Sequence, residues 1–214
     1  MTAGPGLLIQ TLSDRPLPYF RLRITAMVRP MSKALPQASL FDDALNPPPL
    51  APLAEIHEPR VSLGTDGYSA KDGVPYWDSM ALNTHRLGHF AARPADPYNA
   101  HEPVDSSAAA IAAQGFLRLG NYLSAHGETA AGKKYFQAGL TVADTLFDAP
   151  YLSTDKKHQG LLLHSVYHRP NGWDHIAKGQ KVPNGESSLW GDYHAMELAL
   201  LIHRLAEGKY YTFF

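Results

Sequence analysis

The sequence predicts an all-α fold, and three long segments with helical periodicity support this prediction. In each segment apolar residues recur every three or four positions. A second observation is the distribution of proline, because ten of the 17 prolines lie within residues 1–60. Proline lacks an amide donor and blocks helix interiors. We therefore expect a proline-rich irregular arm over residues 1–60 and a helical domain over residues 61–214.

The first helical segment follows Asp105, a good N-cap, and runs from Ser106 to about Ser124. The second runs from about Ala130 to Phe147, and the third from about Ser188 to Glu207. The expected core positions of the first two are Ala109, Ala112, Phe116, Leu119 and Leu123, then Phe136, Leu140, Ala143 and Leu146. Helices that are apolar on more than one side are buried between layers, and three of them cannot cover one another. The helices are therefore expected to belong to a larger helical assembly.

Composition excludes several classes of function. With 19 Lys+Arg against 20 Asp+Glu the net charge is −1, so the positive excess typical of nucleic-acid or anionic-membrane binding is lacking. The absence of cysteine excludes disulfides, a thiolate metal site and a cysteine nucleophile. No apolar run approaches the roughly 20 residues that span a bilayer. The first apolar cluster, Leu7 to Ile9, is too short for a signal peptide, so a cytoplasmic location is predicted, with a periplasmic or secreted location as the alternative if the true N-terminus is missing.

The residues with side chains suited to ligand binding or catalysis lie in the loops. An apolar run over residues 161–166 is predicted as a strand and is followed by a polar, aromatic stretch. All three tryptophans lie in loops or at a helix start, where they either bind a ligand or seal a helix end. Aromatic faces beside Asp, Asn, Arg and His suit a sugar. The candidate binding residues are Trp77, Asp78, His164, His168, Arg169, Asn171, Trp173, Ser187, Ser188, Trp190 and Tyr193.

Other site chemistries receive little support from the sequence. His164 and His168 have a metal-ligand spacing, but no His-Glu-x-x-His pattern exists, so no metal is predicted. Neither a Gly-x-Ser-x-Gly turn nor a phosphate-binding glycine loop occurs, and no cofactor is expected. Arg169 could hold the carboxylate of a uronic acid or pair with Asp174.

Glycoside hydrolysis usually needs paired carboxylates. The candidates are Asp78, Asp105, Asp174, Glu186 and Asp192. Asp105 and Asp192 lie at helix starts, which explains them without a catalytic role. The catalytic residues therefore stay unassigned.

Four motifs follow one another in the chain: DGVPYWD at 72–78, PVDSSAAAIAA at 103–113, LLLHSVYHRP at 161–170 and WGDY at 190–193. Together they resemble the C-terminal part of unsaturated glucuronyl hydrolases and the related unsaturated rhamnogalacturonyl hydrolases, over roughly residues 67–205. The resemblance implies part of a six-hairpin α/α-barrel. It also implies a substrate: oligosaccharides, left by polysaccharide lyases, with an unsaturated uronic acid at one end. Members of the family hydrate its C4=C5 double bond with an aspartate as acid and base, without metal or cofactor.

In this family the two central aspartates lie in the N-terminal half of the barrel, for which the chain has no counterpart. We therefore expect a truncated glycosidase that keeps substrate contacts around Trp77, the 164–171 loop and the 187–193 turn. Two alternatives stay open. The chain is a non-catalytic carbohydrate-binding remnant, or it is a helical interaction module whose exposed helix faces bind a partner or a second copy.

Overall fold

A computed structural model describes residues 69–209, and its framework is helical. Three α-helices are present in this range: α3 (Ser106–Ala125), α4 (Thr129–Leu146) and α5 (Leu189–Ala206). Over the same residues the only β-type pairing consists of isolated bridges, such as Tyr76 with Val104. The all-α class predicted from periodicity is therefore confirmed for the described residues. The proline-rich arm over residues 1–60 lies outside them.

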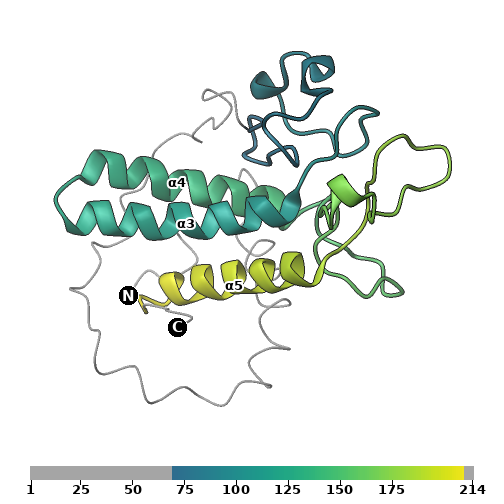
Figure 1. The fold of residues 1–214 in the computed structure, drawn as a ribbon. Coiled ribbons are helices and arrows are strands. Elements are labelled where there is room, and N and C mark those ends of the chain that lie inside the picture. The colour runs from purple at the N-terminus through teal and green to yellow at the C-terminus, as the bar shows by residue number, and fades with distance from the viewer. Residues whose placement is uncertain (1–68, 210–214) are drawn as a thin grey trace.

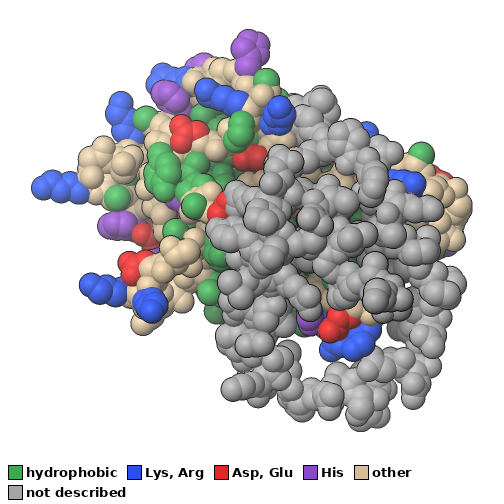
Figure 2. All heavy atoms as spheres, turned by 180° about the vertical axis from the view of Figure 1, so that it is seen from behind, with side chains coloured by type: hydrophobic (Ala, Val, Ile, Leu, Met, Phe, Trp, Pro, Cys, Tyr) green, Lys and Arg blue, Asp and Glu red, His purple; other side chains and the backbone are tan. Residues whose placement is uncertain are grey.

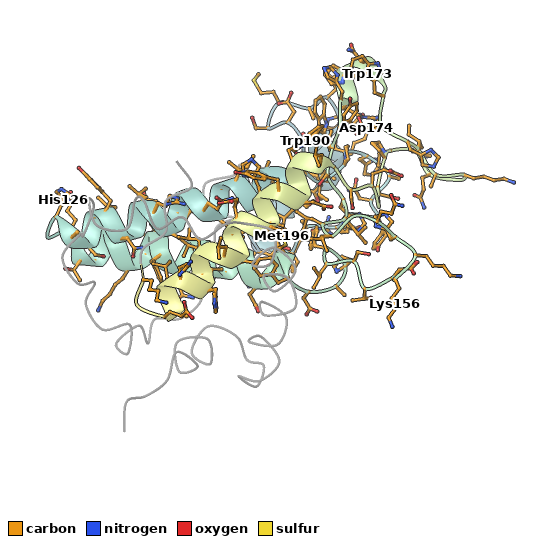
Figure 3. The ribbon with its side chains drawn as sticks, turned by 90° about the horizontal axis from the view of Figure 1, so that it is seen from below. His126, Lys156, Trp173, Asp174, Trp190 and Met196 are labelled. Carbon is orange, nitrogen blue, oxygen red and sulfur yellow. The ribbon has the colours of Figure 1, made fainter. Side chains whose placement is uncertain are left out.

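The three helices lie side by side; the short turn between α3 and α4 lies at one end, and the long irregular segments gather at the other (Figure 1). α3 and α4 form an antiparallel hairpin, and α5 runs in the same direction as α3 and packs mainly on it. The N-termini of α3 and α5 and the C-terminus of α4 therefore share one end of the bundle. Residues 69–105 and 147–188 form the irregular structure at that end, which we call the loop end. His126 lies at the opposite end (Figure 3).

Small residues allow α3 and α4 to approach closely. An added Cβ at Gly120 would lie 2.6 Å from the main-chain nitrogen of Phe136, and one at Gly132 would lie 2.7 Å from the Gly120 carbonyl oxygen. The expected core face of the first helix is consequently wrong in part, because Leu119 is 39% exposed. The positions of α3 that are buried instead are Ser106, Ser107, Ala109, Ala110, Ala113, Gln114, Leu117 and Gly120.

The helix ends follow local sequence signals. The carboxylate of Asp105 accepts the N–H groups of Ser107 and Ala108 at 3.0 and 3.3 Å, so the predicted N-cap is confirmed. α3 ends at a turn in which Gly127 has φ 86°, a conformation that glycine adopts without strain. The hydroxyl of Ser188 accepts the N–H of Gly191 at 3.1 Å and caps α5. The predicted core residues of the second helix are all buried.

The predicted strand over residues 161–166 is wrong. Only Leu162 forms a bridge, with Leu152. Farther along, the chain leaves the extended conformation at His164, which has φ 66°. In this part of the chain the carboxylate of Asp192 accepts the N–H groups of Leu161 and Leu162, which therefore join no ladder. No helix within residues 69–209 is both long and apolar enough to cross a bilayer.

Candidate functional site

The loop over residues 167–174 is a compact turn held by one carboxylate. Asp174 accepts the main-chain N–H groups of Tyr167 and His168, the latter at 3.0 Å. Asn171 N donates to His168 Nδ1 at 3.3 Å, and a single 3₁₀ turn, η5 (Arg169–Asn171), forms between them. Several short-range bonds therefore fix the direction in which the side chains of this turn project.

This turn brings together three aromatic rings from two segments that are distant in sequence. Tyr167 stacks on Trp190 of α5, with ring centroids 5.3 Å apart and an interplanar angle of 21°. Trp173 lies against Tyr167 at 5.9 Å. The exposed fractions of Tyr167, Trp173 and Trp190 are 55%, 60% and 37%. We call these three residues the aromatic platform, and Figure 3 shows Trp173 and Trp190 close together, with Asp174, at the loop end.

The start of α5 supplies further parts of the same surface. Leu189 is exposed, and Tyr193 follows Trp190 by one helical turn and is 46% exposed. Ser188 is buried and serves as the helix cap, and the hydroxyl of Ser187 is enclosed beside Gly160. Of the predicted residues in the 187–193 turn, Trp190 and Tyr193 are thus available to a ligand, whereas Ser188 is the helix cap and the Ser187 hydroxyl is buried without a hydrogen-bond partner among the described residues.

His164 is buried, so it is not available to a ligand at the surface, and it links neighbouring segments instead. Its Nδ1 accepts the N–H of Gly185 at 3.0 Å, so the neutral ring carries its proton on Nε2, and its carbonyl oxygen accepts the N–H of Ser106. Burial lowers the pKa of the His164 imidazole to about 4, and the main-chain carbonyl of Pro150 opposes this shift in part. The ring packs edge-on against Tyr98 and Tyr151, at centroid distances of 5.2 and 5.7 Å.

Trp77 and Asp78 occupy a different loop at the same end. The indole Nε1 of Trp77 donates to Oε2 of Glu102 at 2.7 Å, and Oε1 of this buried glutamate accepts the N–H and the side-chain amide of Asn83. Asp78 is exposed and accepts the N–H of Met80 at 2.8 Å. No ring contact within the described residues joins Trp77 to the aromatic platform. The predicted residues thus fall into two groups, on separate loops.

Arg169 and Asp174 do not pair with each other in the part of the chain that the structure describes. Asp174 is occupied by main-chain donors, so the predicted alternative of an Arg169–Asp174 ion pair is wrong. Asp105 and Asp192 also serve local structure. Asp105 caps α3, as its position at the helix start predicted, whereas Asp192 accepts the N–H groups of residues 161–162, which its position in the first turn of α5 did not predict.

The structure adds residues that the sequence did not single out. Tyr98 is exposed at the loop end, at 59%. Burial raises the pKa of the Asp72 carboxyl, whereas the N–H groups of Val74 and Ala95, which donate to it at 3.3 and 3.0 Å, oppose that rise. Asp72 belongs to the first motif of the resemblance, and this was the one signal that could have pointed to it.

Hydrophobic side chains gather on one face of the loop end, and Lys, Arg and His side chains project around it (Figure 2). Over residues 69–209 no three His, Asp or Glu side chains come together as a metal site would require. Comparisons with protein families, with curated proteins and with solved structures find no match.

Proposed function

We propose that the loop end binds oligosaccharides that carry an unsaturated uronic acid, as part of a glycosidase similar to the unsaturated uronyl hydrolases. The observation that carries this proposal is the aromatic platform. Tyr167, Trp173 and Trp190 present exposed rings, two of them stacked at 5.3 Å. Aromatic rings that serve only for packing are buried, so exposed rings that stack on one another are typical of a binding surface.

Polar groups beside the platform suit an acidic sugar. His168 lies 4.8 Å from Trp173, ring centre to ring centre, and Arg169 follows it in the same turn. Among the described residues no carboxylate neutralises Arg169. A guanidinium without a protein partner can bind the carboxylate of a uronic acid through two parallel hydrogen bonds. Asn171, exposed in the same turn, offers an amide to the hydroxyl groups of the sugar.

The proposed reaction is hydration of the C4=C5 double bond, which needs a proton donor for C4 and a water molecule for C5. Most carboxylates at the loop end already accept main-chain N–H groups, as Asp174 and Asp192 do. Within residues 69–209 the Glu186 side chain has no hydrogen-bond partner, and Asp78 uses only one of its oxygens, for Met80. These two carboxyl groups are the first to test as the proton donor of this chain. A cytoplasmic location and membership of an α/α-barrel remain parts of the proposal.

Binding and catalysis are tested separately with a lyase-generated unsaturated oligosaccharide. Titration calorimetry measures binding to the unaltered chain and to Trp190→Ala, with Tyr122→Ala as the control at the opposite end of the bundle. We expect Trp190→Ala to weaken binding about fivefold or more, because truncating an exposed aromatic anchor removes about 1 kcal/mol or more of binding free energy. If the unaltered chain does not bind the sugar, the proposal is wrong.

Loss of the ultraviolet absorbance of the conjugated double bond reports the reaction itself. If absorbance falls and the rate is abolished in Glu186→Gln or in Asp78→Asn, the chain contains its own proton donor. If the chain binds the sugar but absorbance is constant, the non-catalytic carbohydrate-binding alternative is correct.

A role as a helical interaction module has a separate observation in its favour. On the outer side of α3, Ile111, Leu119 and Tyr122 are 47%, 39% and 59% exposed, and the helix has a single charged residue, Arg118. Exposed apolar stripes of this kind often bind other proteins. Sedimentation of the chain with and without Leu119→Glu tests self-association. Larger particles that the substitution disperses would favour this role, and a monomer in both cases would exclude binding between copies.

A further inference from the structure

The clearest feature that the aromatic platform leaves unexplained is Tyr98. Its ring is 59% exposed, although the loop that carries it is tightly bonded and partly buried. We propose that Tyr98 is a further contact residue of the carbohydrate-binding surface, and that this surface extends from the platform to the 96–102 loop. The inference rests on the proposed function and assigns a second ligand-binding element to it.

The loop of Tyr98 is rigid. The N–H of Tyr98 donates to the carboxylate of Asp96 at 2.9 Å. The side chain of Asn99 donates to the carbonyl oxygens of Asp96 and Glu102, both at 2.7 Å, and accepts the N–H groups of His101 and Glu102 at 2.8 and 3.0 Å. The side chain of Asn99 therefore connects the two ends of the 96–102 turn. A tyrosine on such a turn loses little conformational entropy when a ligand covers it.

His164 joins this loop to the segment that leads to the platform. The Tyr98 ring meets the His164 ring edge-on at 5.2 Å, and His164 Nδ1 accepts the N–H of Gly185 at 3.0 Å. The next residue, Ser165, donates its N–H to the Glu186 carbonyl oxygen at 3.0 Å. Glu186 is followed by the cap and first turn of α5, which carry Trp190. His164 thus contacts the Tyr98 ring and bonds to Gly185, in the segment that leads to α5 and Trp190.

Tyr98 packs against a buried histidine and is nevertheless exposed itself. His164 is 2% exposed and is enclosed by Tyr98 on one side and Tyr151 on another. The two rings meet at an interplanar angle of 87°, and Tyr98 remains 59% exposed. A tyrosine that packs with one part and presents the rest is an amphipathic contact of the kind found in binding sites.

The chain provides a matched control for this residue. Tyr122 is also 59% exposed and also packs on a histidine, His126, with centroids 4.0 Å apart. It lies on the last turns of α3, at the end of the bundle away from the loops, where Figure 3 shows His126. Replacing either tyrosine removes a side chain of equal exposure from a contact with a histidine ring, although the interplanar angle is 87° at His164 and 30° at His126. Only the replacement at the loop end is expected to change sugar binding.

The test measures binding of a lyase-generated unsaturated uronyl tetrasaccharide to the full chain by titration calorimetry. We expect Tyr98→Ala to weaken binding about fivefold or more, Tyr98→Phe to retain most of the affinity and Tyr122→Ala to leave it unchanged. As a second measurement, 3-fluorotyrosine is incorporated into the unaltered chain, and fluorine NMR follows the titration. The Tyr98 signal, assigned by its absence in Tyr98→Phe, should shift in a saturable way while the Tyr122 signal stays in place.

The fluorine titration decides the question even if Tyr98→Ala fails to fold. If the unaltered chain binds and Trp190→Ala weakens binding, but the Tyr98 signal does not respond, this inference is wrong and the proposed function stands. If the unaltered chain does not bind the tetrasaccharide, the proposed function fails and this inference fails with it.

Discussion

Replacing Gly120 with alanine tests the close approach of α3 and α4. The new Cβ would lie 2.6 Å from the main-chain nitrogen of Phe136 and 2.8 Å from the carbonyl oxygen of Gly132. These are backbone atoms of α4, so no side-chain rotation relieves the overlap and the helices must separate. Gly115, in the same helix, provides the control, because its Cβ would meet no atom within 4 Å.

The change in the free energy of unfolding in each alanine variant is the sum of two contributions. Alanine is favoured over glycine in a helix by about 1 kcal/mol, and this gain applies to both positions. Overpacking a tight contact costs about 1–3 kcal/mol, and the cost at Gly120 belongs at the upper end because only backbone can move. We therefore expect Gly115→Ala to raise the free energy of unfolding by about 1 kcal/mol and Gly120→Ala to lower it by about 2 kcal/mol.

Urea unfolding followed by far-ultraviolet circular dichroism measures both values, and comparing the two variants cancels the helix-propensity gain. If Gly120→Ala proves as stable as Gly115→Ala, the two helices do not approach as closely as described, and the account of their packing is wrong.

Three further predictions concern single side chains. Asp174→Ala should disrupt the 167–174 turn and change the fluorescence of Trp190, whereas Asp155→Ala, which also removes a carboxylate bonded to a nearby N–H in an exposed loop, should leave it unaltered. Because the pKa of His164 falls from 6.5 to about 4 on folding, its contribution to stability is complete above pH 6.5 and decreases by about 3 kcal/mol as the pH falls to 4. Unfolding curves across this range should show that slope and should lose it in His164→Asn, since asparagine tolerates the positive φ. Asp105→Ala should lower the free energy of unfolding by about 1 kcal/mol through loss of the α3 cap, and a melting temperature equal to that of the unaltered chain would contradict the capping role.

Local sequence signals located the helices because those signals act over only a few residues. Asp105 caps α3, and glycine permits the turn after it at Gly127. The expected span of the first helix, from Ser106 to about Ser124, differs from α3 by one residue at its C-terminal end. The apolar face of the second helix was also predicted, because α4 buries the large residues of its periodic stripe.

The buried face of α3 could not be predicted in the same way. Periodicity favours large apolar residues, such as Leu119, as the core, yet α3 buries alanines and Gly120 and leaves Leu119 exposed. Glycine and alanine carry little hydrophobic signal of their own. Their role arises only when a second helix with Gly132 and Gly139 lies opposite them, and residues on two different elements decide that arrangement.

The candidate site, like the helices, was predictable from the sequence only in part. The sequence by itself determined that Trp173, Trp190, His168 and Arg169 lie in loops or at a helix start, since proline and glycine interrupt the helical pattern around them. Which side chains meet was decided by tertiary structure alone. Tyr167 belongs to the platform because Asp174 holds its turn and α5 places Trp190 against its ring. His164, in contrast, is buried in a contact with Tyr98. Helix boundaries depend on interactions a few residues apart. The stacking of Tyr167 on Trp190 and the contact of Tyr98 with His164 instead join segments that are distant in the chain, and no local pattern encodes how such segments pack.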